Sequence, residues 1–346
     1  MKEDIKSLTL PQLSETFREM GQPAYRAKQV YEWLHGKRAL SFAGMSNLPK
    51  ELRGALEERF SIAALSCLRR QVSGLDGTEK LLLGLPDGQS VEAVLMRYKY
   101  GNTVCISTQV GCRMGCRFCA STLGGLVRGL TPGEMIDEVY AMERFCGEKV
   151  GGVVLMGIGE PLDNYENVLR FLTILSSAEG MNLSLRHVSL STCGLVPEID
   201  RLAGERLGLT LSVSLHAPDD ETRKAIMPIA RRYPLPELMA ACRRYFERTG
   251  RRVSYEYALI AGKNDSPMQA KKLCALLAGQ NCHVNLIPVN EVAERDCRRG
   301  SREAIERFQH LLVRGGLNAT IRRELGSDIS AACGQLRRET AAEEGM

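Results

Sequence analysis

The amino-acid sequence predicts an α/β protein whose βα units curl into a full or partial barrel, preceded by a small helical unit. The length of 346 residues suggests about two domains. From residue 103 onward, short apolar runs alternate with helical patterns, which is typical of βαβ units and a parallel sheet. Before residue 70, apolar residues such as Leu10, Leu13 and Phe17 recur at helical spacing.

The composition supports a folded protein that is neither secreted nor embedded in a membrane. Hydrophobic residues make up 44% and charged residues 25%, close to globular averages. No apolar run approaches the roughly 18 residues of a membrane span, and the first residues form no hydrophobic signal region. The 12 cysteines therefore favour metal or redox chemistry over a disulfide framework. A net charge of +5 permits an acidic partner such as RNA but does not require one.

Residues 1–70 are predicted to form three short helices, near 8–17, 24–34 and 48–60. The basic residues between the acidic ones would suit a surface that lies on a phosphate backbone, or an ordinary solvated face. These residues are Arg26, Lys28, Lys37, Arg38, Lys50 and Arg53. Residues 71–102 are predicted to form a β-ribbon linker, with strands at 80–85 and 90–98 joined by an Asp87-Gly88 turn.

The main unit, residues 103–338, contains seven predicted strands and six predicted helices. The strands are 103–108, 152–156, 187–190, 209–216, 253–260, 283–288 and 319–323; the helices lie near 132–146, 164–178, 196–204, 235–249, 267–278 and 301–315. Thr131, Pro132 and Glu134 form a capping box at the first of these helices. Active sites of such barrels lie at the carboxyl ends of the strands. The polar tail, 339–346, is expected to be disordered.

The strongest chemical signal is Cys112-Arg-Met-Gly-Cys116-Arg-Phe-Cys119, on the loop after the first barrel strand. Structural zinc usually takes four ligands, commonly as two separated pairs. Three cysteines on one loop instead fit a 4Fe–4S cluster with one iron left open to chelate a small molecule. Zinc, or chance clustering, is the alternative.

A second signal, Met156-Gly-Ile-Gly-Glu160-Pro-Leu162, follows the second barrel strand. The glycines allow a ligand close to the backbone, and the Glu160 carboxylate can accept hydrogen bonds from an amino group. Alone, Gly-x-Gly-Glu is more often a turn. Ser191, Ser214, His216 and Asn290 end further strands on the same rim, where they would suit a ribose, an adenine and a carboxylate. Singly, each is more often a satisfied polar group.

Two stretches of the chain resemble a known family. The three-cysteine loop is similar to that of the radical S-adenosylmethionine (SAM) superfamily, in which SAM chelates the open iron through its amino and carboxylate groups. Asp328-Ile-Ser-Ala-Ala-Cys333-Gly-Gln-Leu336, after Arg322-Arg-Glu-Leu-Gly326, resembles the C-terminal signature of the RlmN family. That family methylates C2 of adenine in 23S ribosomal RNA and in some transfer RNAs. The resemblance runs from about Asp4 to Leu336 and implies a radical SAM partial (β/α)6-type TIM barrel.

The resemblance implies roles residue by residue. Cys112, Cys116 and Cys119 match the cluster ligands. Cys333 matches the cysteine that becomes S-methylated, Cys105 its resolving partner, and Glu92 the proton acceptor. The positions that match SAM contacts are Gly159, Glu160, Ser191, Ser214, Leu215, His216 and Asn290.

The implied reaction uses SAM twice, because C2 of adenine is electron-poor and not a nucleophile. One SAM methylates the Cys333 thiolate. A second supplies a 5′-deoxyadenosyl radical that takes a hydrogen atom from this methyl group, and the methylene radical adds to C2. Glu92 or Cys105 removes the C2 proton, and Cys105 then attacks the Cys333 sulfur to release the base. The resulting disulfide must be reduced in each cycle, which favours the cytoplasm.

The family further implies an electron donor such as flavodoxin or ferredoxin. No membrane partner is expected from the composition, and the chain is expected to be a monomer. Three residues depart from the family's pattern: Cys193 and Ser330 stand where serine and aspartate are usual, and Glu291 where proline is common. Six cysteines match no motif and are interpreted as small buried hydrophobes: Cys67, Cys146, Cys242, Cys274, Cys282 and Cys297.

Two alternatives remain at this stage. The Cfr-type enzyme methylates C8 of the same adenine, but its glycine motif typically reads Gly-Glu-Ala, whereas this chain has Gly159-Glu160-Pro161, and Arg323-Glu324-Leu325-Gly326 also favours C2. A non-enzymatic iron–sulfur redox sensor that binds RNA would explain the cysteine loop. It would give no reason for Glu160 or for Cys105 together with Cys333.

Overall fold

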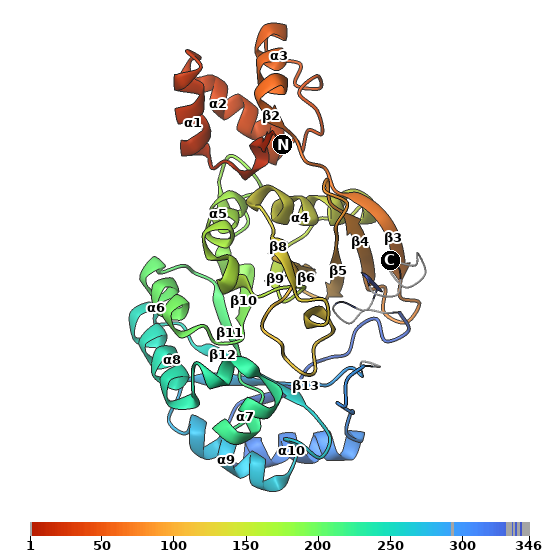
Figure 1. The fold of residues 1–346 in the computed structure, drawn as a ribbon, viewed down its shortest axis with the longest axis vertical. Helices are drawn as coiled ribbons and strands as arrows, with labels where there is room; N and C mark the ends of the chain where they lie inside the picture. The colour runs from red at the N-terminus through yellow and green to blue at the C-terminus, as the bar shows by residue number, and fades with distance from the viewer. Residues whose placement is uncertain (1, 292–293, 330–333, 335, 338–339, 341–346) are drawn as a thin grey trace.

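The computed structural model describes residues 2–291, 294–329, 334, 336–337 and 340. Its centre is one ten-stranded sheet in the order β14-β13-β12-β11-β10-β9-β6-β5-β4-β3. The molecule is elongated, with helices α1 to α3 at one end and α9 and α10 at the other (Figure 1). Since β14 and β3 are both edge strands, the sheet stays open and the predicted barrel is partial.

The parallel half of the sheet contains all seven predicted strands, each beside the next in sequence. These strands are β6 (Gly101–Ile106), β9 (Gly152–Leu155), β10 (Val188–Thr192), β11 (Thr210–Ser214), β12 (Val253–Leu259), β13 (Cys282–Pro288) and β14 (Ala319–Ile321). This order follows from the βα connections, because a strand that is followed by a helix and a parallel strand is placed beside that next strand. The α/β partial-barrel prediction is confirmed.

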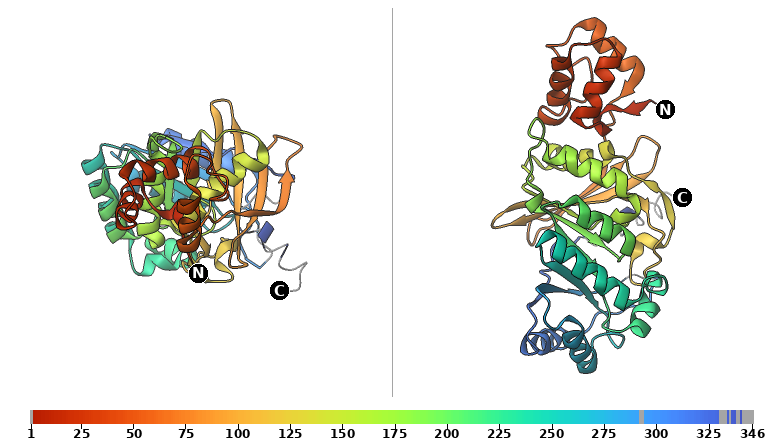
Figure 2. Two further views of the ribbon diagram at one scale, coloured as in Figure 1. Left: turned by 90° about the horizontal axis from the view of Figure 1, so that it is seen from above. Right: turned by 90° about the vertical axis from the view of Figure 1, so that its left-hand side faces the viewer.

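Helices connect the parallel strands and cover the outer face of the curled sheet (Figure 2). The six predicted helices are α4 (Pro132–Cys146), α5 (Tyr165–Ser176), α6 (Val196–Glu205), α8 (Leu235–Thr249), α9 (Pro267–Leu277) and α10 (Arg302–Arg314). The expected capping box begins α4: the Glu134 amide donates to Thr131 Oγ1, and the Thr131 amide donates to the Glu134 carboxylate. A further helix, α7 (Asp220–Ile226), was not predicted.

The ribbon preceding the barrel belongs to the same sheet. Strands β3 (Ser66–Val72), β4 (Glu79–Gly84) and β5 (Ser90–Tyr98) are antiparallel, and β5 pairs directly with β6. The Asp87-Gly88 turn forms as expected, with Gly88 at a φ of +82° that favours glycine. A short hairpin of β7 (Gln109–Gly111) and β8 (Leu126–Gly129) flanks the cysteine loop.

The N-terminal helices have an apolar core of their own. The elements are α1 (Leu10–Glu19), α2 (Ala24–Tyr31), α3 (Lys50–Arg59) and a small pair of strands, β1 (Glu3–Asp4) with β2 (Phe60–Ser61). A buried ion pair joins this unit to α4, with Lys6 Nζ 2.5 Å from Asp137 Oδ1. The other oxygen of Asp137 accepts the Leu65 amide at 2.7 Å, so both sides of the carboxylate are used at this junction.

Short 3-10 helices complete the described elements: η1 (Ile5–Ser7), η3 (Ala120–Thr122), η4 (Pro161–Asn164), η5 (Leu185–His187) and η6 (Pro228–Arg231). The π-helix η2 (Glu32–Gly36) continues α2. Some basic residues of the N-terminal unit are engaged internally, since Arg38 pairs with Glu143 of α4 and Arg53 donates to the Ala43 carbonyl. Within the described part of the chain, every helix is too short or too polar to cross a bilayer.

Candidate active site

The carboxyl ends of the parallel strands surround a cavity of about 260 Å³, here called the strand-end cavity. Six of the seven predicted SAM contacts line it together with the three cysteines. They are Cys112, Cys116, Cys119, Gly159, Glu160, Ser191, Ser214, His216 and Asn290. The remaining one, Leu215, has a fully buried side chain that is not part of the lining.

The β7–β8 hairpin anchors the cysteine loop. The Cys112 amide donates to the Gly125 carbonyl at 2.9 Å. Gly111 has a φ of +76°, and a Cβ at this position would lie 2.0 Å from the Gly125 carbonyl oxygen. Thr122 Oγ1 donates to the carbonyls of Cys116 and Cys119, which closes the loop from its other side. Glycine and these hydrogen bonds therefore fix the backbone that carries the three thiols.

The three cysteines suit a polynuclear cluster better than a single metal ion. Across the described residues, no three histidine, cysteine or acidic side chains converge closely enough to hold one ion. All three cysteines nevertheless line the same cavity, as is needed when each sulfur binds a different iron. Burial raises the pKa of the Cys112 thiol to about 12 and raises that of Cys116 as well. The positive charge of bound metal is what would stabilise these groups as thiolates.

Glu160 is buried at the start of η4, where its carboxylate has two backbone partners. Oε2 accepts the Cys193 amide at 2.7 Å, and Oε1 accepts the Leu162 amide at 3.0 Å. Burial raises the pKa of this carboxyl, and the hydrogen bonds oppose that shift. Each carboxylate oxygen can accept more than one hydrogen bond, so Glu160 can shape its loop and still bind an ammonium group in the cavity.

The nearby glycines are required first by backbone packing. Gly159 has a φ of +114°, and a Cβ there would lie 2.8 Å from the Gln109 amide nitrogen. A Cβ on Gly157 would lie 2.5 Å from the Ile106 carbonyl oxygen. The motif therefore lets the loop after β9 lie against β6 and β7, in addition to leaving one wall of the cavity open.

His216 is held as a neutral imidazole. Its Nδ1 accepts the Ala258 amide at 2.9 Å, so a ring proton must be on Nε2. Burial, with a contribution from the charge of Arg223, lowers its pKa to about 3. Phe118 of the cysteine loop contacts the ring edge-to-face, with centroids 4.7 Å apart. His216 can therefore donate one hydrogen bond to a ligand but carries no charge at neutral pH.

Sequence reasoning missed Arg223, a fully buried arginine on α7. Its guanidinium donates to the carbonyls of Cys193 and Leu215, at 2.8 and 3.2 Å. These carbonyls belong to the loops after β10 and β11: Ser191 and Ser214 lie near the ends of the two strands, and His216 lies in the second loop. No sequence motif points to this role, because it depends on two loops that meet only in the fold.

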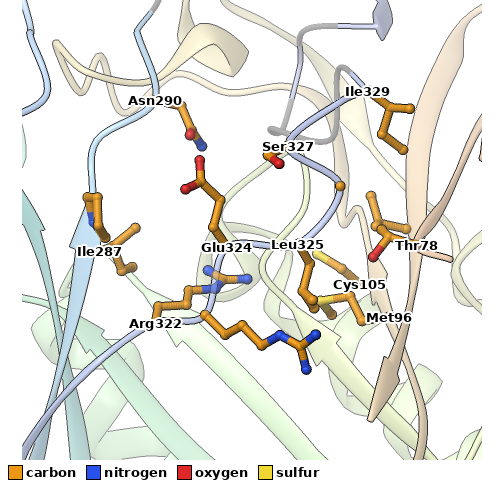
Figure 3. Close-up of a pocket in the computed structure, with 14 residues that line it drawn as sticks. Thr78, Met96, Cys105, Ile287, Asn290, Arg322, Glu324, Leu325, Ser327 and Ile329 are labelled. Atoms are coloured by element: carbon orange, nitrogen blue, oxygen red, sulfur yellow. The ribbon is translucent and has the colours of Figure 1, made fainter. Parts of the chain in front are cut away.

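A second cavity of about 240 Å³, the Cys105 cavity, adjoins the first (Figure 3). Cys105, Met96 and Leu325 lie together on one side of it, whereas Ile287 and Asn290 lie on the other (Figure 3). Ile287, Asn290 and Arg322 line both cavities, so the two spaces meet at these residues. Cys105 itself is buried in β6.

Glu92 is buried beside the chain that follows Cys333. Its Oε2 accepts the Gly334 amide at 2.6 Å, and its Oε1 accepts the Arg337 amide at 2.7 Å. Lys80 Nζ, fully buried, lies 3.0 Å from Oε2. Cys333 and Ser330 lie outside the described residues, as does most of the 339–346 tail. Gly334 packs against η3, where a Cβ would lie 3.2 Å from the Ser121 amide nitrogen.

Comparisons with known proteins agree with this arrangement. Residues 106–274 match the radical SAM superfamily, and residues 3–62 match the ribosomal RNA large subunit methyltransferase N-terminal domain. A probable dual-specificity RNA methyltransferase RlmN from Lachnoclostridium phytofermentans is 53% identical, over 97% of this chain and 95% of that protein. One from Pelotomaculum thermopropionicum is also 53% identical, over 98% of this chain and 92% of that protein.

A solved structure is similar over the same span. The radical SAM methyltransferase from Sphaerobacter thermophilus superposes with a TM-score of 0.91 at 47% identity, covering 96% of this chain and 98% of that one. The superfamily match explains the cysteine loop and its cavity, since radical SAM proteins use a 4Fe–4S cluster and SAM. The identity over nearly the full length is specific to one branch of that superfamily. This chain therefore belongs to the RlmN family of radical SAM dual-specificity RNA methyltransferases.

Proposed function

We propose that this RNA methyltransferase adds a methyl group to C2 of an adenine in 23S ribosomal RNA and in transfer RNA, through an S-methylated Cys333. The observation that carries the proposal is the contact between two cavities. One is lined by the three cysteines and Glu160, and the other by Cys105. A site for SAM and a site for a reactive thiol thus meet at shared residues.

We assign the cluster to Cys112, Cys116 and Cys119 and SAM to the strand-end cavity. Bound there, they would supply a carbon-centred radical able to take a hydrogen atom from a methyl group. Glu160 would accept hydrogen bonds from the ammonium of SAM, and His216 would donate one through Nε2. Ser191, Ser214, the Leu215 backbone, Gly159 and Asn290 complete the proposed contacts.

The thiol chemistry is assigned to Cys333 and Cys105. The Cys333 thiolate takes a methyl group from the sulfonium of SAM, and its sulfur later carries the carbon that becomes joined to C2. The adduct at C2 loses its proton and one electron, the latter to the one-electron redox partner that the cluster and its donor would supply. The Cys105 thiolate then attacks the Cys333 sulfur: an S–S bond forms, the S–CH₂ bond breaks, and the released carbon takes up a proton. Two electrons from a reductant restore both thiols.

The contacts of Glu92 support separate roles for Glu92 and Cys105 at the step that removes the C2 proton. Both of its oxygens bind backbone amides, those of Gly334 and Arg337, and it does not line either cavity. Cys105 does line one. We therefore propose that Glu92, paired with Lys80, holds the chain beside Cys333, and that Cys105 is the better-placed acceptor for the C2 proton.

The proposal is tested by locating the methyl group in RNA treated with cluster-loaded protein, SAM and a reductant. Nuclease digestion and mass analysis against synthetic standards should yield 2-methyladenosine from both a ribosomal RNA fragment and a transfer RNA. The product 8-methyladenosine would assign the chain to the Cfr-type reaction instead. Absence of SAM cleavage and of methylated RNA would favour a redox sensor.

Replacing Glu160 by glutamine should weaken SAM binding while leaving the cluster in place. The substitution keeps the shape of the side chain but removes the charge that is proposed to hold the ammonium, and such charge-assisted bonds contribute about 1.5–3 kcal/mol. A loss of roughly tenfold or more in SAM affinity is therefore expected by equilibrium binding, with unchanged iron content. Unchanged affinity would leave Glu160 only its role in the loop.

The remaining partners follow from this chemistry. The Cys105–Cys333 disulfide must be reduced after each turnover, which favours a reducing compartment, the cytoplasm. A flavodoxin or ferredoxin is proposed as the electron donor, and the chain is proposed to act as a monomer.

The N-terminal unit, residues 1–70, is proposed as a further RNA contact, because Tyr25 and Lys28 are exposed on α2 and Lys37 lies over the Trp33 ring.

A further inference from the structure

The inner face of the sheet is unusually polar below the strand-end cavity. In (β/α)₈ barrels the interior is packed mainly with branched apolar side chains. Here the strands carry polar residues inward, one layer closer to their amino ends: Ser189, Ser212, Ser254, Glu256 and Asn285. On β12 the alternate residues Tyr255 and Tyr257 are fully buried instead, and Tyr257 packs against Phe308 of α10. Strand alternation thus separates a helix-facing apolar side from a polar inner side.

These inward residues line a third space of about 680 Å³, here called the lumen cavity. Its volume lies within the range of pockets that hold small organic ligands. It shares Met156, Glu256 and Arg322 with the strand-end cavity, and it shares Met96 and Arg322 with the Cys105 cavity. Arg322 therefore lies where all three cavities meet, next to the proposed site of reaction.

Glu256 is a buried carboxyl group in the lining of this cavity, and the mechanism above does not use it. Its side chain is 4% exposed, and Asn285 Nδ2 donates to Oε2 at 2.7 Å. Ser254 Oγ is 3.5 Å from Oε1, at the outer limit of a hydrogen bond. Burial raises the pKa of Glu256, while the Asn285 hydrogen bond and the charge of Arg322 oppose that shift.

The Glu256–Asn285 pair has the donor and acceptor chemistry that an adenine edge requires. The exocyclic amino group of adenine donates hydrogen bonds, which a carboxylate oxygen accepts. The adjacent ring nitrogen accepts one, and the second proton on Asn285 Nδ2 can supply it. Burying a carboxylate is costly unless it is partnered, and folding alone does not require one at an inward position of β12.

The mouth of the lumen cavity has features typical of single-stranded RNA binding. Tyr98 and Tyr100 stack with their rings nearly parallel, 5° apart in plane and with centroids at 5.0 Å. Tyr100 is 82% exposed, so its outer face is open to a further ring. Arg186 and His187 of η5, just before β10, line the same cavity. Unpaired RNA bases commonly stack on aromatic side chains beside basic groups.

We propose that the lumen cavity binds the target adenine nucleotide, which enters past the Tyr98–Tyr100 stack and presents its amino edge to Glu256 and Asn285. This inference rests on the proposed function, because it assigns the base that is methylated. The nucleotide would have to leave its stack in the RNA to enter, as bases do in other enzymes that modify them. From there the base would adjoin both the SAM cavity and Cys105.

The test compares two RNA substrates, one with adenine and one with purine, which lacks the 6-amino group, at the target position. We expect Glu256→Met to lower kcat/KM for adenine RNA about tenfold or more and to change it little for purine RNA. The readout is the ratio of kcat/KM for adenine RNA to kcat/KM for purine RNA, compared between the variant and the unsubstituted protein. Any intrinsic difference in the reactivity of C2 between the two bases cancels in this comparison. Glu256→Gln is the matched control: it keeps an acceptor oxygen and should retain most of the discrimination.

Two further measurements separate this role from its alternatives. Methylation of Cys333 needs SAM but no RNA, so this step and equilibrium SAM binding measure any effect of Glu256→Met through the strand-end cavity, which Glu256 also lines. Both should fall by a much smaller factor than kcat/KM for adenine RNA. Tyr100→Ala should raise KM for RNA with little change in kcat. The inference would be overturned if folded Glu256→Met kept the adenine-to-purine ratio of the unsubstituted protein. It would also be overturned if the variant lost SAM affinity by the same factor as kcat/KM for adenine RNA. Failure of the unsubstituted protein to methylate either RNA would instead contradict the proposed function.

Discussion

Cys105→Ala protein should accumulate covalently joined to its RNA substrate through Cys333. The substitution leaves the strand-end cavity intact, so SAM binding, Cys333 methylation and addition to C2 should all proceed. Release then fails, because no thiolate lines the Cys105 cavity to attack the Cys333 sulfur. Turnover should fall to at most one event per protein, and a denaturing gel should show a band that nuclease digestion shifts back.

Two matched variants make this result interpretable. Cys333→Ala removes the sulfur that carries the methyl group, so it should give neither protein methylation, nor RNA methylation, nor an adduct. Cys274→Ala makes the same chemical change on α9, away from the cavities, and should turn over normally. Peptide mass analysis should find the RNA remnant on the peptide that contains Cys333. Normal turnover by Cys105→Ala protein would rule out the two-cysteine release step for this chain.

Replacing any one of Cys112, Cys116 and Cys119 by alanine should abolish the cluster and, with it, all SAM cleavage and RNA methylation. On the proposed assignment these three thiolates are the whole protein ligand set, with one iron left open, so the loss of one should not be compensated. Iron and sulfide content and visible absorption after anaerobic reconstitution measure the cluster. SAM cleavage under reducing conditions measures its function.

Cys193 provides the control for this experiment, because it is a fourth cysteine that lines the strand-end cavity. Burial and the nearby Glu160 raise the pKa of its thiol, and its amide and carbonyl bind Glu160 and Arg223 through the backbone. Cys193→Ser should therefore retain a full cluster. A cluster that survives in the Cys112→Ala protein but is lost in the Cys193→Ser protein would mean that the ligand set has been misassigned.

Much of the fold was predictable because its main determinants are local. Short strand-like runs that alternate with helical patterns identified the parallel strands, and the Thr131–Glu134 box identified the start of α4. The missed elements have weak local signals. Strand β3 alternates between exposed and half-buried residues, including Arg69 and Arg70, and α7 spans only seven residues.

The residues of the site likewise fall into those that a local sequence signal identifies and those that only the fold brings together. Motif residues at strand ends converge because parallel strands place their carboxyl ends on one rim, so Glu160, Ser191 and His216 could be identified in advance. Arg223 could not, since its role is to bind carbonyls of two separate loops. Glu256 did leave a signal, a single charged residue at an inward position of a buried strand, but its meaning depends on Asn285 of the neighbouring strand.

The central claim is that the methyl carbon reaches RNA by way of Cys333, and an isotope transfer tests it most directly. Protein methylated in the absence of RNA with SAM carrying a trideuterated methyl group would be freed of SAM, then given RNA, unlabelled SAM and reductant for one turnover. The account predicts 2-methyladenosine with two deuterium atoms, since one is removed as the hydrogen atom and a solvent proton is gained on release. Unlabelled methyl in the RNA, with the label still on the protein, would contradict it.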